Sequence, residues 1–503
     1  MTTELSTDTA EPPLAQRRSA RDAAALGAIG ALVSFAFSWI PSLWFDETAT
    51  VVAATRSWAG LWHMLQTVDA VHGLYYSFMH VWFDLVGYTP LTLRLPSALA
   101  AGGAVAVTVL VVSRISTRRI AILTGIVLIL LPRFAWAGDE GRSYAVTILA
   151  CAAVTLMLVI AVQSASVKAW HWIVYGVLCV VSIYLFAFFV LVVLAHAVTM
   201  IWLARRGAVQ RSTVVAYLVT SALTAAATIP LLPLVTAQSG QVRWIGSLNW
   251  NSFWDVLVGQ YFVNNVVFAI IAWPLAIAGV VVSRSTRTRG NQALRALAVP
   301  MVILPTAVLL VVTAVLVPVY IPRYLTMTLP AFAMLLALAL DRLPTRRLTA
   351  AALVVLTLTW LPTYVADRTE NLKHDTAWTS VATSLSELRA VPGSPGGIDD
   401  ARAGVVFGPA RLHNLRTIAY SYPDAFSGLK DVALATPYWE SRDLWEVARP
   451  LEPALLNGLD AVWVIKDAVA QDPRIEQALD AAGFVLDQSH DFTYNRLELW
   501  IRR

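Results

Sequence analysis

Two neighbouring acidic residues, Asp46 and Glu47, stand directly after an apolar stretch that is long enough to cross a membrane. The chain runs from Ala23 to Phe45 without a charged residue. Ionisable side chains at membrane depth cost about 2.5 to 3.5 kcal/mol each, so their presence there favours a function. A carboxylate at this position can act as a general base or bind a metal ion. The alternative is a pair of ordinary charges that mark the end of a helix at the interface.

The two acids are expected to have different tasks. Neighbouring residues of a helix or strand do not share a face. We therefore expect one carboxylate to face a cavity and the other to anchor the loop.

A histidine follows in the same loop, within the stretch "DAVHGLYYS", which also contains Asp69. His72 stands before an aromatic pair and can bind a phosphate or shape the site of an acceptor. An interfacial histidine without such a task is the more common case.

A third group of charges lies in the stretch "PRFAWAGDEGRSYAV". Arg133, Asp139, Glu140 and Arg142 place four charges within ten residues, with a glycine on either side of the acid pair. A guanidinium such as that of Arg142 can bind a phosphate through two parallel hydrogen bonds. The alternative is a solvated turn with internal ion pairs, each contributing about 0.2 to 1 kcal/mol.

A fourth candidate is Arg323, in the stretch "VYIPRYLTMTLP". It begins a predicted span on the outer side, against the usual preference for basic residues on the cytoplasmic side. Its position beside Tyr320 and Tyr324 suits an anionic headgroup, and the alternative is an arginine whose charged end extends to the interface. Arginines neutralise the charge on a departing phosphate, and carboxylates accept the proton of an attacking hydroxyl. Together the four groups predict group transfer from a lipid phosphate.

The elements that carry these residues are predicted to be membrane-spanning helices. The chain has 503 residues, of which 57% are hydrophobic and 14% charged, and uncharged runs of about 20 residues recur along the first 366. The net charge of +5 comes from basic residues dispersed among loops, which does not indicate a nucleic-acid partner. We expect about eleven spans, at residues 23–43, 93–113, 120–138, 143–163, 171–186, 187–204, 213–235, 260–283, 297–319, 324–340 and 348–366.

Basic clusters between the spans predict a cytoplasmic N-terminus and an extracytoplasmic C-terminus. The expected organisation is a cytoplasmic tail at 1–21, a transmembrane domain at 22–366 and a small extracytoplasmic α/β domain at 367–503. The first outer loop, at 44–92, contains "RSWAGLWHMLQTV" and "LYYSFMHVWFDLVG", whose helical spacing predicts interfacial amphipathic helices. A second outer loop, at 236–259, is rich in tryptophan.

The C-terminal domain is predicted from its own patterns. "AGVVFGP" and "DAVWVIKD" are typical of short buried strands, "RIEQALDAAG" of a helix, and "FVLDQSHDF" with "RLELWIRR" of a closing strand pair. The stretch "VPGSPGGIDD" at 391–400 is interpreted as a linker.

The ordered set of motifs resembles the GT-C superfamily of membrane glycosyltransferases, and most nearly the protein O-mannosyltransferase and aminoarabinose-transferase type. The resemblance covers about residues 30 to 340, and Gly73 and Leu74 replace the paired prolines of that type. The matching motifs are "WFDE" (44–47), "HGLYY" (72–76), "GYTPLTLRLPSAL" (87–99), "GRSYA" (141–145) and "PRYL" (322–325).

The resemblance implies a transferase that moves a sugar, mannose or arabinose, from a polyprenyl-phosphate donor. Asp46 would match the catalytic base and Glu47 its supporting neighbour, while Asp139 or Glu140 would match a second acidic position. Arg142 and Arg323 would match groups near the lipid phosphate. The remaining expected substrate-binding residues are His72, Tyr144 and Tyr324.

The expected acceptor is a lipid, glycan or protein on the extracytoplasmic face of the plasma membrane. Some relatives use a divalent cation, Mg²⁺ or Mn²⁺, and others do not, so the metal requirement stays open. The high content of Ala, Val and Arg fits a bacterial, and more narrowly an actinobacterial, relative.

Two other classes of function are compatible with a polytopic membrane chain. A transporter or lipid flippase would place charges near the middle of its spans. Here they gather at one side, and the one interior ionisable residue, His196, is interpreted as a packed helix-contact residue. A non-catalytic membrane scaffold would retain its function after both acid pairs were replaced.

Overall fold

The computed structural model describes residues 13–285, 288–370, 376–390, 402–408, 414–470 and 472–503. The predicted linker at 391–400 and most of the predicted cytoplasmic tail lie outside these residues. The chain divides into two compact units. The first contains Met1–Ala36, Ala70–Tyr75 and Arg94–Val365, and the second contains Phe37–Asp69, Tyr76–Leu93 and Ala366–Arg503.

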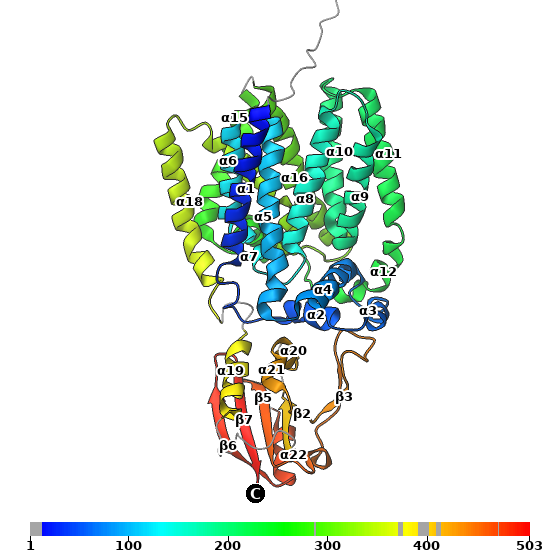
Figure 1. Ribbon diagram of the computed structural model, residues 1–503, viewed down its shortest axis with the longest axis vertical. Coiled ribbons are helices and arrows are strands. Elements are labelled where there is room, and N and C mark those ends of the chain that lie inside the picture. The colour runs from blue at the N-terminus through cyan, green and yellow to red at the C-terminus, as the bar shows by residue number, and fades with distance from the viewer. Residues whose placement is uncertain (1–12, 286–287, 371–375, 391–401, 409–413, 471) are drawn as a thin grey trace, which may run out of the picture. The chain divides into compact units, whose positions relative to one another are not determined.

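The first unit is a bundle of apolar helices (Figure 1). Its longer elements are α1 (Pro13–Phe35), α5 (Pro90–Ile115), α6 (Arg118–Leu130), α7 (Pro132–Gly138), α8 (Tyr144–Gln163), α9 (Ala169–Leu185), α10 (Val190–Arg205), α11 (Arg211–Thr228), α12 (Leu231–Ala237), α15 (Val266–Ser285), α16 (Arg289–Val315), α17 (Leu329–Leu340) and α18 (Arg346–Ala366). Shorter turns of helix join them: η1 (Ala70–His72), η2 (Ala187–Phe189), η3 (Ser239–Val242), α13 (Trp250–Trp254), η4 (Asp255–Gly259), α14 (Gln260–Phe262) and η5 (Pro322–Thr328).

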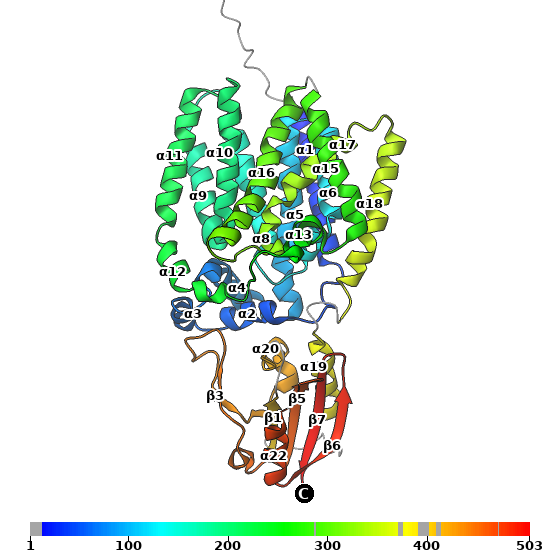
Figure 2. The same cartoon turned by 180° about the vertical axis from the view of Figure 1, so that it is seen from behind.

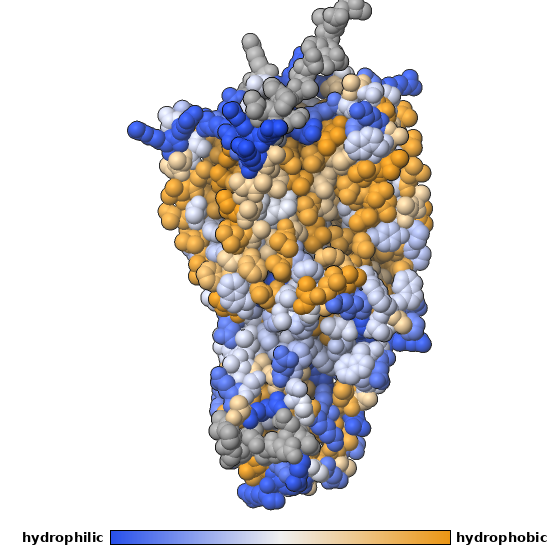
Figure 3. Space-filling model, viewed as in Figure 1, coloured by the Kyte–Doolittle hydropathy of each residue, from blue (hydrophilic) through white to orange (hydrophobic). Residues whose placement is uncertain are grey.

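Each predicted span overlaps one of these helices or a bent pair of them. In the described part of the chain, seven helices are long and apolar enough to cross a membrane, or up to nine if each bent pair is one span. The pairs are α6 with α7, bent by 68°, and α11 with α12, bent by 50°. Figure 3 shows the apolar surface that this composition gives the bundle, with a hydrophilic rim at one end of the helices. The chain is therefore a multi-pass membrane protein, and the count of eleven spans stays a prediction.

Helix α17 forms the centre of the bundle. All twelve of its residues are buried, as expected for a helix that is apolar on every side. It packs against α6, α15 and α16. Its crossing with α15 depends on Gly279, because a Cβ atom there would lie 2.0 Å from the carbonyl oxygen of Leu335.

A buried polar network joins three neighbouring helices of the same bundle. His196 on α10 is fully buried. Its Nε2 lies 3.2 Å from the hydroxyl of Thr155 on α8, and its Nδ1 lies 3.1 Å from the hydroxyl of Tyr175 on α9. These contacts agree with the interpretation of His196 as a packed helix-contact residue.

The second unit combines the first outer loop with the C-terminal domain. The loop contributes α2 (Phe45–Ala54), α3 (Trp58–Leu65) and α4 (Gly73–Val86), the last of which continues from the first unit. Helices α3 and α4 coincide with the two predicted amphipathic helices. The other helices of this unit are α19 (Trp378–Arg389), α20 (Thr417–Ser421), α21 (Pro423–Phe426), η7 (Pro453–Leu456) and α22 (Pro473–Ala481).

The C-terminal domain is a five-stranded mixed sheet, which confirms the predicted small α/β domain (Figure 2). The strand order is β2-β1-β5-β7-β6, with β1 parallel to β2 and β5, and β7 antiparallel to β5 and β6. The strands are β1 (Ala403–Phe407), β2 (Lys430–Asp431), β5 (Ala461–Asp467), β6 (Phe484–Asp491) and β7 (Asn495–Arg502), and β3 (Leu434–Thr436) pairs separately with β4 (Val447–Ala448). The predicted strands, helix and closing strand pair all occur at the expected residues.

Candidate active site

The two acids after the first apolar stretch lie in the first turn of α2, in the second unit. Carboxylates are favourable there because unpaired backbone N–H groups give a helix N-terminus a partial positive charge. The two side chains differ in burial, since Glu47 is fully buried and Asp46 is partly exposed. The two neighbouring carboxylates therefore have different environments.

The first half of α2 is held by α20 and the residue after it, in the C-terminal domain. The hydroxyl of Thr48 lies 2.6 Å from that of Ser421. Just before the helix, the backbone N–H of Leu43 donates to the hydroxyl of Tyr422 at 3.0 Å. These two bonds bracket Asp46 and Glu47 in the sequence, so the C-terminal domain restrains the turn that carries both acids.

A buried arginine anchors the end of α2 to the same domain. The guanidinium of Arg56 donates to the carbonyl oxygens of Ser441 and Asp443, both at 2.7 Å, and of Leu444 at 3.0 Å. It also lies over the ring of Tyr438, 5.6 Å from the centroid. Burial lowers the pKa of Arg56 to about 10. Arg56 thus fastens the far end of the helix through three backbone carbonyls.

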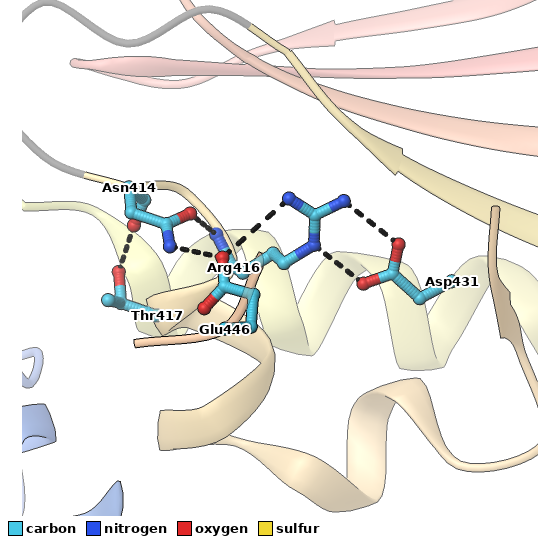
Figure 4. Close-up of polar contacts among 5 residues, drawn as sticks. All are labelled: Asn414, Arg416, Thr417, Asp431 and Glu446. Atoms are coloured by element: carbon cyan, nitrogen blue, oxygen red, sulfur yellow. Dashed lines mark hydrogen bonds and ion pairs between the residues drawn. The ribbon is translucent and has the colours of Figure 1, made fainter. Parts of the chain in front are cut away.

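A second buried arginine, Arg416, stabilises the start of α20 (Figure 4). Arg416 precedes the helix and binds Asp431 through two hydrogen bonds of 2.7 and 3.1 Å. Its third nitrogen lies 3.7 Å from a carboxylate oxygen of Glu446, which also accepts a short hydrogen bond from Asn414. Burial alone would lower the pKa of Arg416, but the hydrogen bond and charge of Asp431, together with the charges of Glu446 and Tyr420, raise that pKa. The cluster fixes the start of the helix whose end contacts α2.

In the first unit, the predicted charged turn lies between α7 and α8. Asp139, Glu140 and Arg142 are all buried, with 0, 0 and 6% of their surfaces exposed. The hydroxyl of Ser97 on α5 donates to the carbonyl oxygen of Glu140 at 2.6 Å. The carbonyl oxygen of Arg142 also lies within reach of this hydroxyl, at 3.3 Å. The burial excludes a merely solvated turn, and Ser97 holds its backbone in place.

His72 contacts this turn. A guanidinium nitrogen of Arg142 lies 3.0 Å from His72 Nε2. Because arginine can only donate, Nε2 is the acceptor and the proton of the neutral ring is on Nδ1. The structure therefore brings together two of the residues predicted from separate motifs, and it fixes a tautomer of the histidine.

Aromatic and basic side chains surround the turn. The ring of Tyr144 lies 5.2 Å from that of Trp136. The guanidinium of Arg133 lies over the ring of Trp136, 4.6 Å from the centroid, and donates to the carbonyl oxygens of Gly259 at 2.7 Å and Gln260 at 3.2 Å. Arg133 therefore ties the second outer loop to the helix that precedes the acidic turn.

Arg323 and Tyr324 lie on η5, which packs against α7 and α8. The guanidinium of Arg323 lies over the ring of Trp244, 5.7 Å from the centroid. Tyr324 stacks on Phe188 at 5.5 Å. The predicted cation is thus held against an aromatic ring of the second outer loop, at the end of the bundle where α8 begins.

The predicted site residues fall into two sets. His72, Asp139, Glu140, Arg142, Tyr144, Arg323 and Tyr324 all belong to the first unit, whereas Asp46 and Glu47 belong to the second. The first set combines buried acids with guanidinium groups, which can bind a phosphate and balance its charge. The second set offers carboxylates, which can accept a proton. Among the described residues, no group of three or more His, Cys, Asp or Glu is placed to hold a metal ion.

Three further residues support the site, and the sequence assigned none of them a role of its own. Ser97 and Arg133 act through backbone carbonyls, and Gln260 bonds with Thr306 at 3.1 Å and Tyr320 at 3.2 Å. Ser97 belongs to the matching motif "RLPSAL", which was a usable signal, and Arg133 is one of the four clustered charges. Gln260 had no signal, because its partners Thr306 and Tyr320 lie far from it in the sequence.

Comparison with solved structures identifies the fold. No protein-family model and no curated protein matches the chain. The structure of ArnT from Cupriavidus metallidurans bound to undecaprenyl phosphate matches with a TM-score of 0.55 and 14% identity, over 94% of this chain and 97% of that one. The chain has the GT-C fold. Other structures of this fold that match it are those of AftD and AglB.

The mycobacterial arabinofuranosyltransferase AftD matches this GT-C chain with a TM-score of 0.51 and 15% identity, over 96% of this chain and 40% of AftD. The oligosaccharyltransferase AglB from Archaeoglobus fulgidus, in complex with an inhibitory peptide and a dolichol-phosphate, matches with a TM-score of 0.50 and 10% identity, over 88% of this chain and 69% of AglB. These matches confirm the fold that the resemblance implied.

Proposed function

We propose that this GT-C protein is a membrane glycosyltransferase that uses a polyprenyl-phosphate sugar donor on the extracytoplasmic face of the plasma membrane. The observation that carries the proposal is the buried turn of Asp139, Glu140 and Arg142 with His72 bonded to it. Buried charges are expensive to keep, and this set lies in a fold whose solved examples include ArnT with undecaprenyl phosphate and AglB with dolichol-phosphate.

The donor phosphate is assigned to the arginines of the first unit. Arg142 and Arg323 would contact its oxygens, with Tyr144 and Tyr324 beside them. His72 would orient the guanidinium of Arg142. Two cations near the departing phosphate would stabilise the charge that develops as the glycosidic bond breaks.

The acceptor is assigned to the acids of α2. The carboxylate of Asp46 would accept the proton of an acceptor hydroxyl, whose oxygen would attack the anomeric carbon from the face opposite the phosphate. The sugar would be transferred with inversion, and the lipid phosphate would leave. Glu47, which is more deeply buried, would support Asp46. The proposed sugar is mannose or arabinose, and the proposed acceptor is a lipid, glycan or protein.

The base is tested with Asp46→Asn. If the carboxylate removes the acceptor proton, kcat should fall at least about a hundredfold, in keeping with the usual contribution of a general base. Transfer from a polyprenyl-phosphate sugar by the purified protein in detergent is the measurement. Asp84→Asn, in α4 of the same unit, is the matched control because its side chain is 67% exposed. Normal turnover by the Asp46 variant would remove this residue from the mechanism.

The phosphate contact is tested with Arg323→Ala. Loss of a charged hydrogen bond to the donor is worth about 1.5 to 3 kcal/mol, so the donor KM should rise at least about tenfold. The kcat for bound donor should change less. Arg243→Ala is the control, because Arg243 is an exposed arginine of the second outer loop. This variant should leave the donor KM unchanged. An unaltered donor KM in Arg323→Ala would contradict the contact.

A further inference from the structure

A long apolar groove lies on the bundle, away from the residues assigned above. It has a volume of about 1030 Å³ and is lined by α9, α11 and Val167. Its lining continues from Ala169 to Val181 on α9 and from Arg211 to Ala227 on α11, which is roughly 18 to 24 Å of helix. The two helices touch in its floor, where a Cβ atom on Gly176 would lie 2.9 Å from the Cγ2 of Thr220. The groove therefore has the length of a lipid chain.

One end of the groove is positively charged. Arg211 lines this end of the groove. Lys168 stands directly before α9, and its two neighbours in the sequence, Val167 and Ala169, also line the groove. Both cations are exposed. Helices α9 and α11 also begin here, and a helix N-terminus carries a partial positive charge. The rest of the lining is almost entirely apolar. A cationic end on an apolar groove matches a lipid with an anionic headgroup and apolar chains.

This charged end is opposite to the end of the bundle that carries the acidic turn. Helix α8 starts beside that turn and runs away from it, and α9 returns antiparallel, so that the far end of α9 packs against η1 with His72. A donor whose phosphate contacts Arg142 has that phosphate at the opposite end of the bundle from Lys168 and Arg211, so the same phosphate cannot contact these two cations. The groove therefore suits a lipid of the other leaflet.

We propose that this groove binds an anionic phospholipid, with the phosphate between Lys168 and Arg211 and an acyl chain along α9 and α11. Basic residues at a membrane face attract anionic lipids with about 1 kcal/mol each. The two cations should therefore favour an anionic over a zwitterionic headgroup by up to about thirtyfold. Binding of such a lipid does not depend on the proposed transferase activity.

The experiment uses delipidated full-length protein in detergent and compares phosphatidylglycerol with phosphatidylcholine by native mass spectrometry. The wild type should bind phosphatidylglycerol at least about fivefold more tightly. The double variant Lys168→Ala/Arg211→Ala should lose this preference while retaining the weaker binding of phosphatidylcholine. Val177→Trp, which fills the groove from an exposed position, should weaken the binding of both lipids.

Arg205→Ala is the matched control, since this arginine lies at the nearby end of α10 and does not line the groove. It should leave the lipid preference intact. Equal binding of the two lipids by the wild type would overturn the proposal, as would a preference for phosphatidylglycerol that survives in the double variant. Displacement of phosphatidylglycerol by polyprenyl phosphate at equal concentration would also overturn it, because the groove would then be a donor site.

Discussion

Asp46 and Glu47 are neighbours in sequence, but their environments differ. Glu47 is fully buried in the first turn of α2, whereas Asp46 is partly exposed. A proton acceptor must be reached by its substrate, while a supporting group need not be. This difference in exposure supports the proposal that Asp46 is the base and Glu47 its supporting neighbour.

At the same scale, Ser97 shows how a small neutral residue supports charged ones. Its hydroxyl contacts two carbonyl oxygens of the acidic turn. We expect Ser97→Ala to lower kcat/KM for transfer roughly tenfold, because each hydrogen bond is worth about 1 kcal/mol. Steady-state kinetics of the purified protein measure the effect. Ser113→Ala is the control, since that hydroxyl bonds only within its own helix, with the carbonyl of Leu110. Equal kinetics in the two variants would refute a positioning role.

At the scale of the elements, Pro96 in α5 creates a contact between α5 and α4. Pro96 has no N–H group, so the carbonyl of Thr92 loses its usual partner within the helix. The indole N–H of Trp82 on α4 donates to this oxygen at 2.8 Å. The carbonyl oxygen that Pro96 leaves without a partner in the helix is therefore also the attachment point of α4.

Packing at the α15–α17 crossing makes a second element-scale prediction. Gly279→Ala should destabilise the protein by about 1 to 3 kcal/mol, because the added Cβ would meet the Leu335 carbonyl at 2.0 Å. Thermal unfolding in detergent measures it as a lower Tm. Gly246→Ala, where no atom lies within 4 Å of an added Cβ, should leave the Tm unchanged. If both variants melt like the wild type, the helices do not cross as closely as the structure has them.

Helices and strands were easier to predict from the sequence than the contacts between segments that are far apart in the chain. The long apolar runs predicted the helices of the bundle, and the short apolar runs around Val405 and Trp463 predicted buried strands, because burial leaves a local pattern in the sequence. The contacts of Gln260 and Ser97 leave no such pattern, since they join segments that are far apart in the chain. Tyr75 shows the same limit, because it lies in the stretch "LYYSFMHVWFDLVG", whose spacing predicts an interfacial helix, and only 1% of its surface is exposed.

At the scale of the molecule, the first outer loop and the C-terminal domain form one compact unit. The sequence predicts that this loop belongs to the transmembrane domain and that a separate domain begins at residue 367, and these domain limits stay a prediction. The bonds of Thr48 and Arg56 explain the grouping, because both reach residues beyond 420.

Arg56 allows a test of this coupling. Arg56→Met keeps the aliphatic stem but removes donors to three carbonyl oxygens, so the second unit should lose about 1.5 to 3 kcal/mol of stability, and transfer should fall with it. Thermal unfolding and transfer assays on the same preparation measure both effects. Arg402→Met, in the same unit, removes a guanidinium that is 59% exposed and pairs with Asp460, and it should cost less than about 1 kcal/mol. A stable and active Arg56 variant would show that α2 does not need this anchor.

The bonds between α2 and the C-terminal domain also bear on how the protein is made. The segment with Asp46 leaves the ribosome early, whereas Ser421, Tyr422 and the residues around Ser441 are synthesised more than 370 positions later. A nascent chain can insert most of its helices before these partners exist. The contacts that restrain the turn with Asp46 and Glu47 are therefore formed last, and an unfinished polypeptide in the membrane would lack them.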